Sequence, residues 1–120
     1  MDPHESTPER PQSKPLLLLH GSLKSPPFSN AIRSQVGFLF RQIQNGERFG
    51  MPISRPMPMI GPGCHELRLS DNAANIEWRV IYCIASDAIL ILDVFAKKTR
   101  TTPSSVIAAC KERLRNYESE

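Results

Sequence analysis

Apolar residues recur at two different spacings along the chain, and each spacing predicts a different kind of element. Between positions 28 and 43 they recur every three or four residues, as on one face of a helix. The positions are Phe28, Ile32, Val36, Leu39, Phe40 and Ile43. We expect this helix to have Pro26 and Pro27 in its first turn. It should end at Gly46, where glycine can adopt the left-handed cap conformation.

Alternation of apolar and polar residues predicts strands over residues 64–69 and 77–84, and a nearly all-apolar run predicts a central strand over residues 89–97. Short turns join them, so we expect these three strands to be antiparallel neighbours. A short apolar run over residues 16–20 predicts one more strand. Thr102 as N-cap and Pro103 as first helical residue begin a second helix. Its apolar stripe is Val106, Ile107, Cys110, Leu114 and Tyr117.

Two segments lack any periodicity. Residues 1–14 are polar and rich in proline, which is typical of a disordered leader. Residues 47–63 hold four prolines, three glycines and three methionines, which predicts a long ordered loop whose methionines fill gaps beneath it. The remaining pattern predicts one compact α/β domain of the α+β kind over residues 15–120. It would contain a mainly antiparallel sheet of about four strands, with the helices on one face.

The charge of the chain is unevenly distributed. The net charge is +3, but residues 15–117 hold 13 of the 15 Lys and Arg and only 7 of the 12 Asp and Glu, or +6. A basic domain favours a polyanionic partner. The chain contains no apolar segment long enough to span a membrane and no signal pattern, so we expect the cytoplasm.

The three cysteines, Cys64, Cys83 and Cys110, have no CxxC spacing and are expected to be small buried hydrophobes. Cys64 and His65 are adjacent on one strand and point to opposite faces, which argues against a zinc site. His65 then points to the core, and His20 at the end of the first strand is expected to be structural.

Strand parity assigns a second set of residues to the face turned away from the helices. If Leu67, Trp78 and Leu90 face the helices, two arginines, a lysine, an aromatic and three carboxylates share the opposite face. That face carries Glu66, Arg68, Glu77, Arg79, Asp93, Phe95 and Lys97. Guanidinium groups bind phosphate, and Phe95 can stack on a base. The alternative is a solvated face on which Arg68 and Arg79 are neutralised by the three carboxylates.

Three segments of the chain resemble the phage-derived HigB-like branch of the RelE toxin superfamily. Residues 63–69 contain the motif ELR, residues 78–82 read WRVIY, and residues 94–103 read VFAKKTRTTP. That branch shows an ELR strand, a (Y/W)R(V/I) strand and an FxKKTxxTP segment in the same order. The resemblance covers most of residues 15–117.

The resemblance implies a RelE-like fold and a toxin of a type II toxin–antitoxin system. Such a toxin is a metal-free endoribonuclease that needs no cofactor and cleaves mRNA, usually on the ribosome, and its partner is a helix-turn-helix antitoxin. Arg68 and Arg79 match the motif arginines and would bind the phosphate and the transition state. Lys97 would lie in the site. Lys98, together with Arg100 and Arg55, would contact the RNA backbone.

Asp93 departs from the pattern, since many relatives carry histidine there. An aspartate can act as a base in catalysis, but it can equally hold Arg68 or Arg79 in an inert salt bridge. Two other functions therefore stay open. One is a non-catalytic phage-derived module that binds RNA or protein, and the other is a toxin with a different target, such as gyrase.

Overall fold

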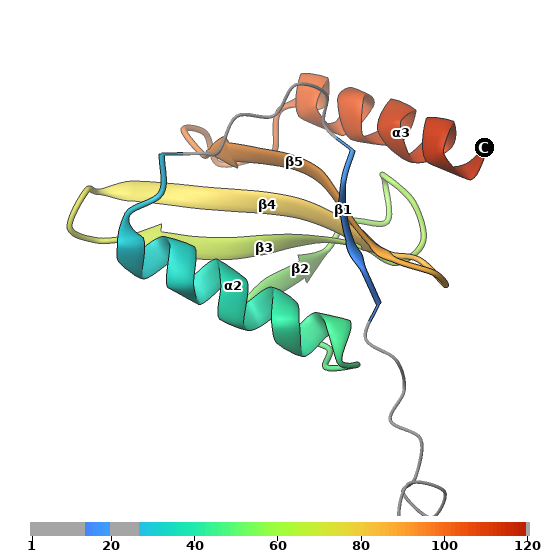
Figure 1. Ribbon diagram of the computed structural model, residues 1–120. Helices are drawn as coiled ribbons and strands as arrows, with labels where there is room; N and C mark the ends of the chain where they lie inside the picture. Colours follow the sequence, from blue (N-terminus) through green and yellow to red (C-terminus); the bar gives the residue numbers. More distant parts are fainter. Residues whose placement is uncertain (1–13, 20–26, 120) are drawn as a thin grey trace, which may run out of the picture.

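The computed structural model describes residues 14–19 and 27–119 (Figure 1). The elements in chain order are β1 (Leu16–Leu18), α2 (Asn30–Gln44), β2 (Ser54–Pro56), β3 (Cys64–Asp71), β4 (Ile76–Ile84), β5 (Ile89–Ala96) and α3 (Ser104–Glu118). The predicted compact α+β domain is confirmed. The expected leader, apart from Lys14, and His20 lie outside the described residues. Within the described ranges, neither helix is long and apolar enough to cross a membrane.

One five-stranded sheet runs in the order β1-β5-β4-β3-β2, and only β1 and β5 are parallel. The sequence predicted about four strands because β2 is hidden among prolines. Pro56 lacks an N–H donor and is tolerated here because β2 is an edge strand. In the segment predicted as a loop, Met57 is fully buried, whereas Met51 and Met59 are about half exposed.

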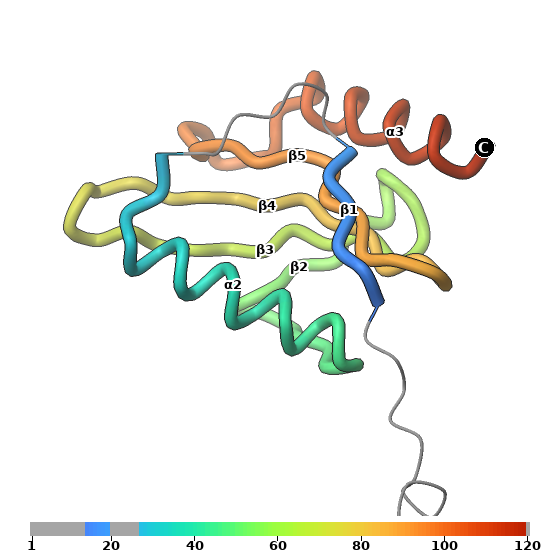
Figure 2. Tube along the Cα trace, viewed as in Figure 1, coloured from blue at the N-terminus to red at the C-terminus, as the bar shows by residue number. Residues whose placement is uncertain are grey.

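The two helices lie on opposite faces of the sheet, which corrects the expectation of helices on one face (Figures 1 and 2). On the α2 face, Ile32, Phe40 and Ile43 pack against residues that include Leu67 and Tyr82. On the other face, α3 packs on a second core. Residues of that second core are Met57, Cys64, Ile81, Cys83, Leu90, Leu92, Cys110 and Leu114.

A β-bulge in β5 changes which face each residue occupies. Ile81 of β4 pairs with Asp93 and the next residue, Tyr82, pairs with Ile91, so Leu92 lies between them as an extra residue. Leu90 and Leu92 consequently face α3, whereas Val94 packs on the α2 core. The prediction that Leu90, Leu92, Val94 and Ala96 share one face is wrong for this reason.

Both helices begin slightly later than predicted. Ser29 is the N-cap of α2, because its hydroxyl accepts a hydrogen bond of 3.2 Å from Ile32 N, and Pro27 precedes the helix. The predicted end is confirmed, since Gly46 follows α2 with φ +104°. The N-cap of α3 is Pro103 and not Thr102, whose hydroxyl is bonded elsewhere.

Candidate functional site

Three cross-strand rows of side chains lie on the face that α3 covers in part. The rows are Arg55, Glu66, Ile81 and Asp93; then Arg68, Arg79 and Phe95; then Ser70, Glu77 and Lys97. The prediction that Glu66, Arg68, Glu77 and Arg79 share one face is confirmed, because β3 and β4 are regular there, but α3 covers part of that face, which was expected to be open. It holds on β5 because the bulge precedes Asp93.

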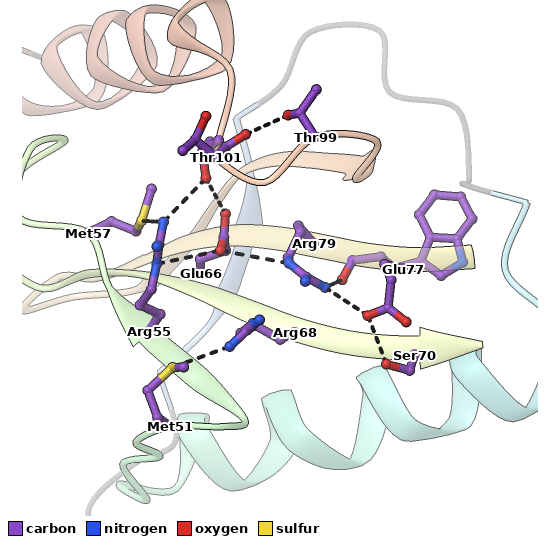
Figure 3. A network of polar contacts seen from close by, with 12 residues as sticks. Met51, Arg55, Met57, Glu66, Arg68, Ser70, Glu77, Arg79, Thr99 and Thr101 are labelled. Atoms are coloured by element: carbon purple, nitrogen blue, oxygen red, sulfur yellow. Dashed lines mark hydrogen bonds and ion pairs between the residues drawn. The ribbon is translucent and has the colours of Figure 1, made fainter. Parts of the chain in front are cut away.

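Glu66 is the centre of a buried polar network (Figure 3). Its Oε1 lies 3.7 Å from Arg55 Nε and 3.8 Å from Arg79 Nε, while Thr102 Oγ1 donates a hydrogen bond of 2.6 Å to Oε2. Glu66 is 0% exposed, and Oε1 and both arginine Nε atoms are buried without a hydrogen bond. One carboxylate therefore joins β2, β4 and the segment that enters α3.

Arg79 is held below the surface, with only 4% of its area exposed. Its Nη1 donates a hydrogen bond of 2.9 Å to Trp78 O and lies 3.5 Å from Oε1 of Glu77. The same Glu77 oxygen accepts a hydrogen bond of 2.8 Å from Ser70 Oγ. Arg79 is therefore fixed between two carboxylates and offers little surface for contact with a ligand.

Arg68 differs from Arg79 in both exposure and pairing. It is half-buried, and its Nη1 lies 3.6 Å from Met51 Sδ, a weak hydrogen-bond acceptor. Within residues 14–19 and 27–119, no carboxylate forms an ion pair with Arg68. This guanidinium is the cation of the face that is best placed to take an anionic ligand.

Lys97 is a fourth cation beside Arg55, Arg68 and Arg79, and it directly follows β5. Partial burial lowers the pKa of its ammonium, and the positive charges of Arg79, Arg55 and Arg68 lower it further, while Glu66 opposes them. The four cations of the three rows outnumber the carboxylates Glu66, Glu77 and Asp93 by one charge. Lys98 and Arg100 are exposed in the loop between β5 and α3, at the rim of this face.

Phe95 and Asp93 lie on the same face, and both interact with the side of the molecule that α3 covers. Phe95 is partly buried against the α3-side core. Asp93 Oδ2 lies 3.6 Å from Arg113 Nη1 of α3, and Oδ1 accepts a hydrogen bond of 2.8 Å from Val94 N. Asp93 forms no ion pair with Arg68 or Arg79, and of these two arginines Glu66 and Glu77 pair with Arg79 alone.

The central role of Glu66 was not predicted from the sequence. Parity placed it on the correct face, yet only as one of three carboxylates that might neutralise the arginines. A clue lay in the spacing, since Glu66 and Arg68 are two residues apart and so share a face. The expectation for His65 is confirmed, because it lies on the α2 face with its ring stacked on Tyr82 at 5.4 Å.

The three cysteines are free and buried in the α3-side core, as predicted. Burial raises the pKa of the Cys110 thiol to about 12, so it is protonated at neutral pH. A hydrogen bond between the Cys64 and Cys83 side chains raises the pKa of Cys64 and lowers that of Cys83. In the described part of the chain, no group of three or more His, Cys, Asp or Glu is placed to hold a metal ion.

Comparison with known proteins identifies the family. No curated protein and no solved structure matches the chain. The family model described as phage-derived protein Gp49-like (DUF891) matches residues 27–115, which include α2, all strands from β2 to β5 and most of α3. This family is of the RelE/HigB-like toxin type. The chain therefore belongs to the phage-derived Gp49-like family.

Proposed function

We propose that the chain is the toxin of a type II toxin–antitoxin system and cleaves mRNA, on the ribosome, as a metal-free endoribonuclease. Membership of a phage-derived family of toxin type supports the toxin assignment. The basic face supports RNA as the substrate, because phosphate contacts from arginine and lysine dominate the affinity of proteins for nucleic acids.

The observation that carries this proposal is the contrast between Arg68 and Arg79. Two arginines face each other on adjacent strands, and carboxylates neutralise only the buried one. Arg68 is half-buried and has no carboxylate counter-ion among the described residues, and such a guanidinium attracts a ligand with closely spaced negative oxygens. A phosphodiester is such a ligand.

The reaction would proceed through the RNA itself. The 2′-hydroxyl oxygen forms a bond to the adjacent phosphorus, the bond to the 5′ oxygen breaks, and a 2′,3′-cyclic phosphate and a 5′-hydroxyl result. Arg68 stabilises the charge on the phosphoryl oxygens. Lys97 gives a proton to the departing 5′ oxygen, since a lysine with a lowered pKa is a better acid. Asp93 accepts the proton of the 2′-hydroxyl.

A cognate helix-turn-helix antitoxin would neutralise the toxin. The basic face favours an acidic segment of that partner, by charge complementarity. Such a segment would compete with RNA for Arg68, so purified antitoxin should displace a bound oligonucleotide. We place the antitoxin over the same face for this reason.

A second candidate is a non-catalytic RNA-binding module on the same fold. The observation that favours it is the contact of Asp93 with Arg113 of α3, which occupies the proposed base. The variant Asp93→Asn distinguishes the two functions. Loss of cleavage with unchanged RNA affinity supports the enzyme, whereas purified protein that binds RNA and yields no product supports the module.

The decisive experiment is primer extension on cellular mRNA after induction of the chain without its neighbouring gene. Wild type should arrest growth and produce defined 5′ ends, and Arg68→Ala should abolish both effects. Arg41→Ala is the matched control, because Arg41 is an exposed arginine on α2, away from the site. Intact mRNA with wild type contradicts the nuclease, and full toxicity of Arg68→Ala points to another target.

A further inference from the structure

A hollow of about 370 Å³ adjoins Arg68 at the edge of the sheet. Its lining comes from three elements and the loop before β2, namely Gln35, Pro52, Ile53, Arg68, Ser70 and Glu77. Its volume is toward the small end of the range of small-molecule sites, about 300–1,000 Å³. The residue proposed above to bind the phosphate, Arg68, therefore also lines this hollow.

The hollow exists because β2 stops before β3 does. Arg68 N donates a hydrogen bond of 2.8 Å to Ile53 O, and on β3 every second residue points its backbone groups to that edge. Ser70 is the next such residue. Its partner in register would be Met51, which lies in a turn closed by hydrogen bonds from Ile53 N and Ser54 N to Gly50 O. The N–H and C=O of Ser70 thus point past the end of β2.

The lining combines two apolar surfaces with groups that form hydrogen bonds. Pro52 and Ile53 are exposed, the latter by 38% of its area, and offer a surface on which a flat ring can pack. Gln35 offers an amide, Ser70 a hydroxyl and Glu77 a carboxylate. A nucleobase has this combination of apolar ring faces and a polar edge.

Glu77 gives the hollow a chemical preference. The contacts of Glu77 with Ser70 and Arg79 both use Oε1, and its side chain is 51% exposed. Oε2 is therefore an oriented acceptor that has no donor of its own among the described residues. A carboxylate accepts hydrogen bonds from exocyclic amino groups, which adenine, cytosine and guanine carry and uracil lacks.

We propose that this hollow is a nucleobase pocket, and that it selects a base with an exocyclic amino group in the nucleotide whose phosphate is bound by Arg68. This inference rests on the proposed function, because it assigns the pocket to the same RNA. It adds a source of sequence preference that the basic face alone does not provide, since phosphate contacts carry no direct sequence information.

The test uses octanucleotides with 2′-O-methyl groups at every position, which prevents cleavage, in fluorescence anisotropy. Oligo-U is compared with oligo-U carrying a single A, C or G. Wild type should bind at least one substituted oligonucleotide roughly five-fold or more tightly than oligo-U. Glu77→Gln, which adds a donor, should reduce that ratio toward one, and Arg68→Ala should weaken all oligonucleotides together.

Gln35→Ala provides a variant without risk to the fold, since Gln35 is exposed on α2, and Ser34→Ala is its control. The ratio should fall in Gln35→Ala and persist in Ser34→Ala. Equal affinity for all four oligonucleotides, with binding that still depends on Arg68, overturns the pocket and leaves the proposed function standing. Failure of every oligonucleotide to bind overturns the pocket, and primer extension then decides the proposed function separately. Ile53 lines the hollow, so a protein partner that covers Ile53 while RNA affinity stays unchanged also overturns the pocket.

Discussion

Arg68 on β3 and Arg79 on β4 are register partners, so two positive side chains stand directly opposite each other on one face. Ile84 N donates a hydrogen bond to Gly63 O, so these two residues form a hydrogen-bonded pair at the end of the ladder of β3 and β4. Hydrogen-bonded and non-hydrogen-bonded pairs alternate along an antiparallel ladder, which makes Arg68 and Arg79 a non-hydrogen-bonded pair. Cα atoms of such pairs are about 4.5 Å apart, and like charges there are destabilising. The fold tolerates this pair because Glu66 and Glu77 neutralise Arg79.

Substitution of Arg68 should mainly weaken RNA binding, whereas substitution of Arg79 should mainly lower the free energy of unfolding. Arg68→Ala removes the repulsion and should change the free energy of unfolding by less than about 1 kcal/mol, while it weakens RNA binding strongly. Arg79→Ala leaves Glu66 with a reduced set of counter-ions in a buried site and should cost about 3–5 kcal/mol. Urea unfolding and RNA binding of both variants measure this. Equal stability losses would contradict the separation.

Glu66→Gln should destabilise the chain by several kcal/mol, because Arg55 and Arg79 lose their shared counter-ion in a buried site. The side chain keeps its size and can still accept the hydrogen bond from Thr102. The pKa of Lys97 gives a second readout, because it would not change if Glu66 had only a structural role. Since Glu66 raises the pKa of Lys97, the pKa measured by NMR should fall further in the variant. An unchanged Lys97 pKa would show that the charge of Glu66 does not act on the site.

Lys97 should make stability depend on pH in the alkaline range. Its folded-state pKa lies below the ordinary 10.5, so between the two values the unfolded chain binds a proton that the folded chain has lost. Stability therefore rises with pH across that window. Lys97→Met removes the titrating group. The difference in unfolding free energy between wild type and Lys97→Met should move in favour of wild type as pH approaches 10.5, and a flat difference would refute the assignment.

A buried hydrogen bond on the α2 side should contribute to stability without affecting RNA. The Ser54 and Tyr82 hydroxyl oxygens are 2.7 Å apart, and Ser54 is 0% exposed. Tyr82→Phe leaves the Ser54 hydroxyl without this partner and should cost about 1–3 kcal/mol. The double variant with Ser54→Ala should recover part of that loss in a double-mutant cycle. Unaltered RNA affinity in Tyr82→Phe is expected as well.

The buried thiols should resist modification while the chain is folded. The pKa of Cys110 is about 12, so at pH 8 almost none of it is thiolate, the reactive form. Iodoacetamide should modify Cys110 slowly in buffer and rapidly in urea. Mass spectrometry of the peptides measures both rates. Rapid labelling of Cys110 in buffer would contradict its position on the buried face of α3.

The sequence pattern was sufficient where strands are regular and insufficient where they are not. Parity placed Arg68 and Arg79 correctly because β3 and β4 alternate without interruption. It did not anticipate the bulge at Leu92, since an extra residue leaves no trace in the uniformly apolar run of residues 89–92.

The structure differs from the prediction more strongly in the position of α3, which covers the opposite face of the sheet from α2. The sequence did contain a sign of this position. Ile81 and Cys83 lie on the face predicted to be open, yet both are apolar. A strand that is apolar on both sides is covered on both sides. Arg79 is buried beside Glu66, which also pairs with Arg55 of β2. The sequence did not predict this arrangement, because the prolines around β2 concealed that strand.

The bulge at Leu92 has a consequence for how relatives of this chain should be aligned. The extra residue frees the Leu92 carbonyl, which accepts a hydrogen bond of 2.7 Å from Arg113 of α3. Removing Leu92 alone would restore regular pairing and keep Asp93 and Phe95 on their present face. A one-residue gap at this position in a relative would thus indicate a different attachment of the helix, while the residues that match Asp93 and Phe95 keep their place on the sheet face.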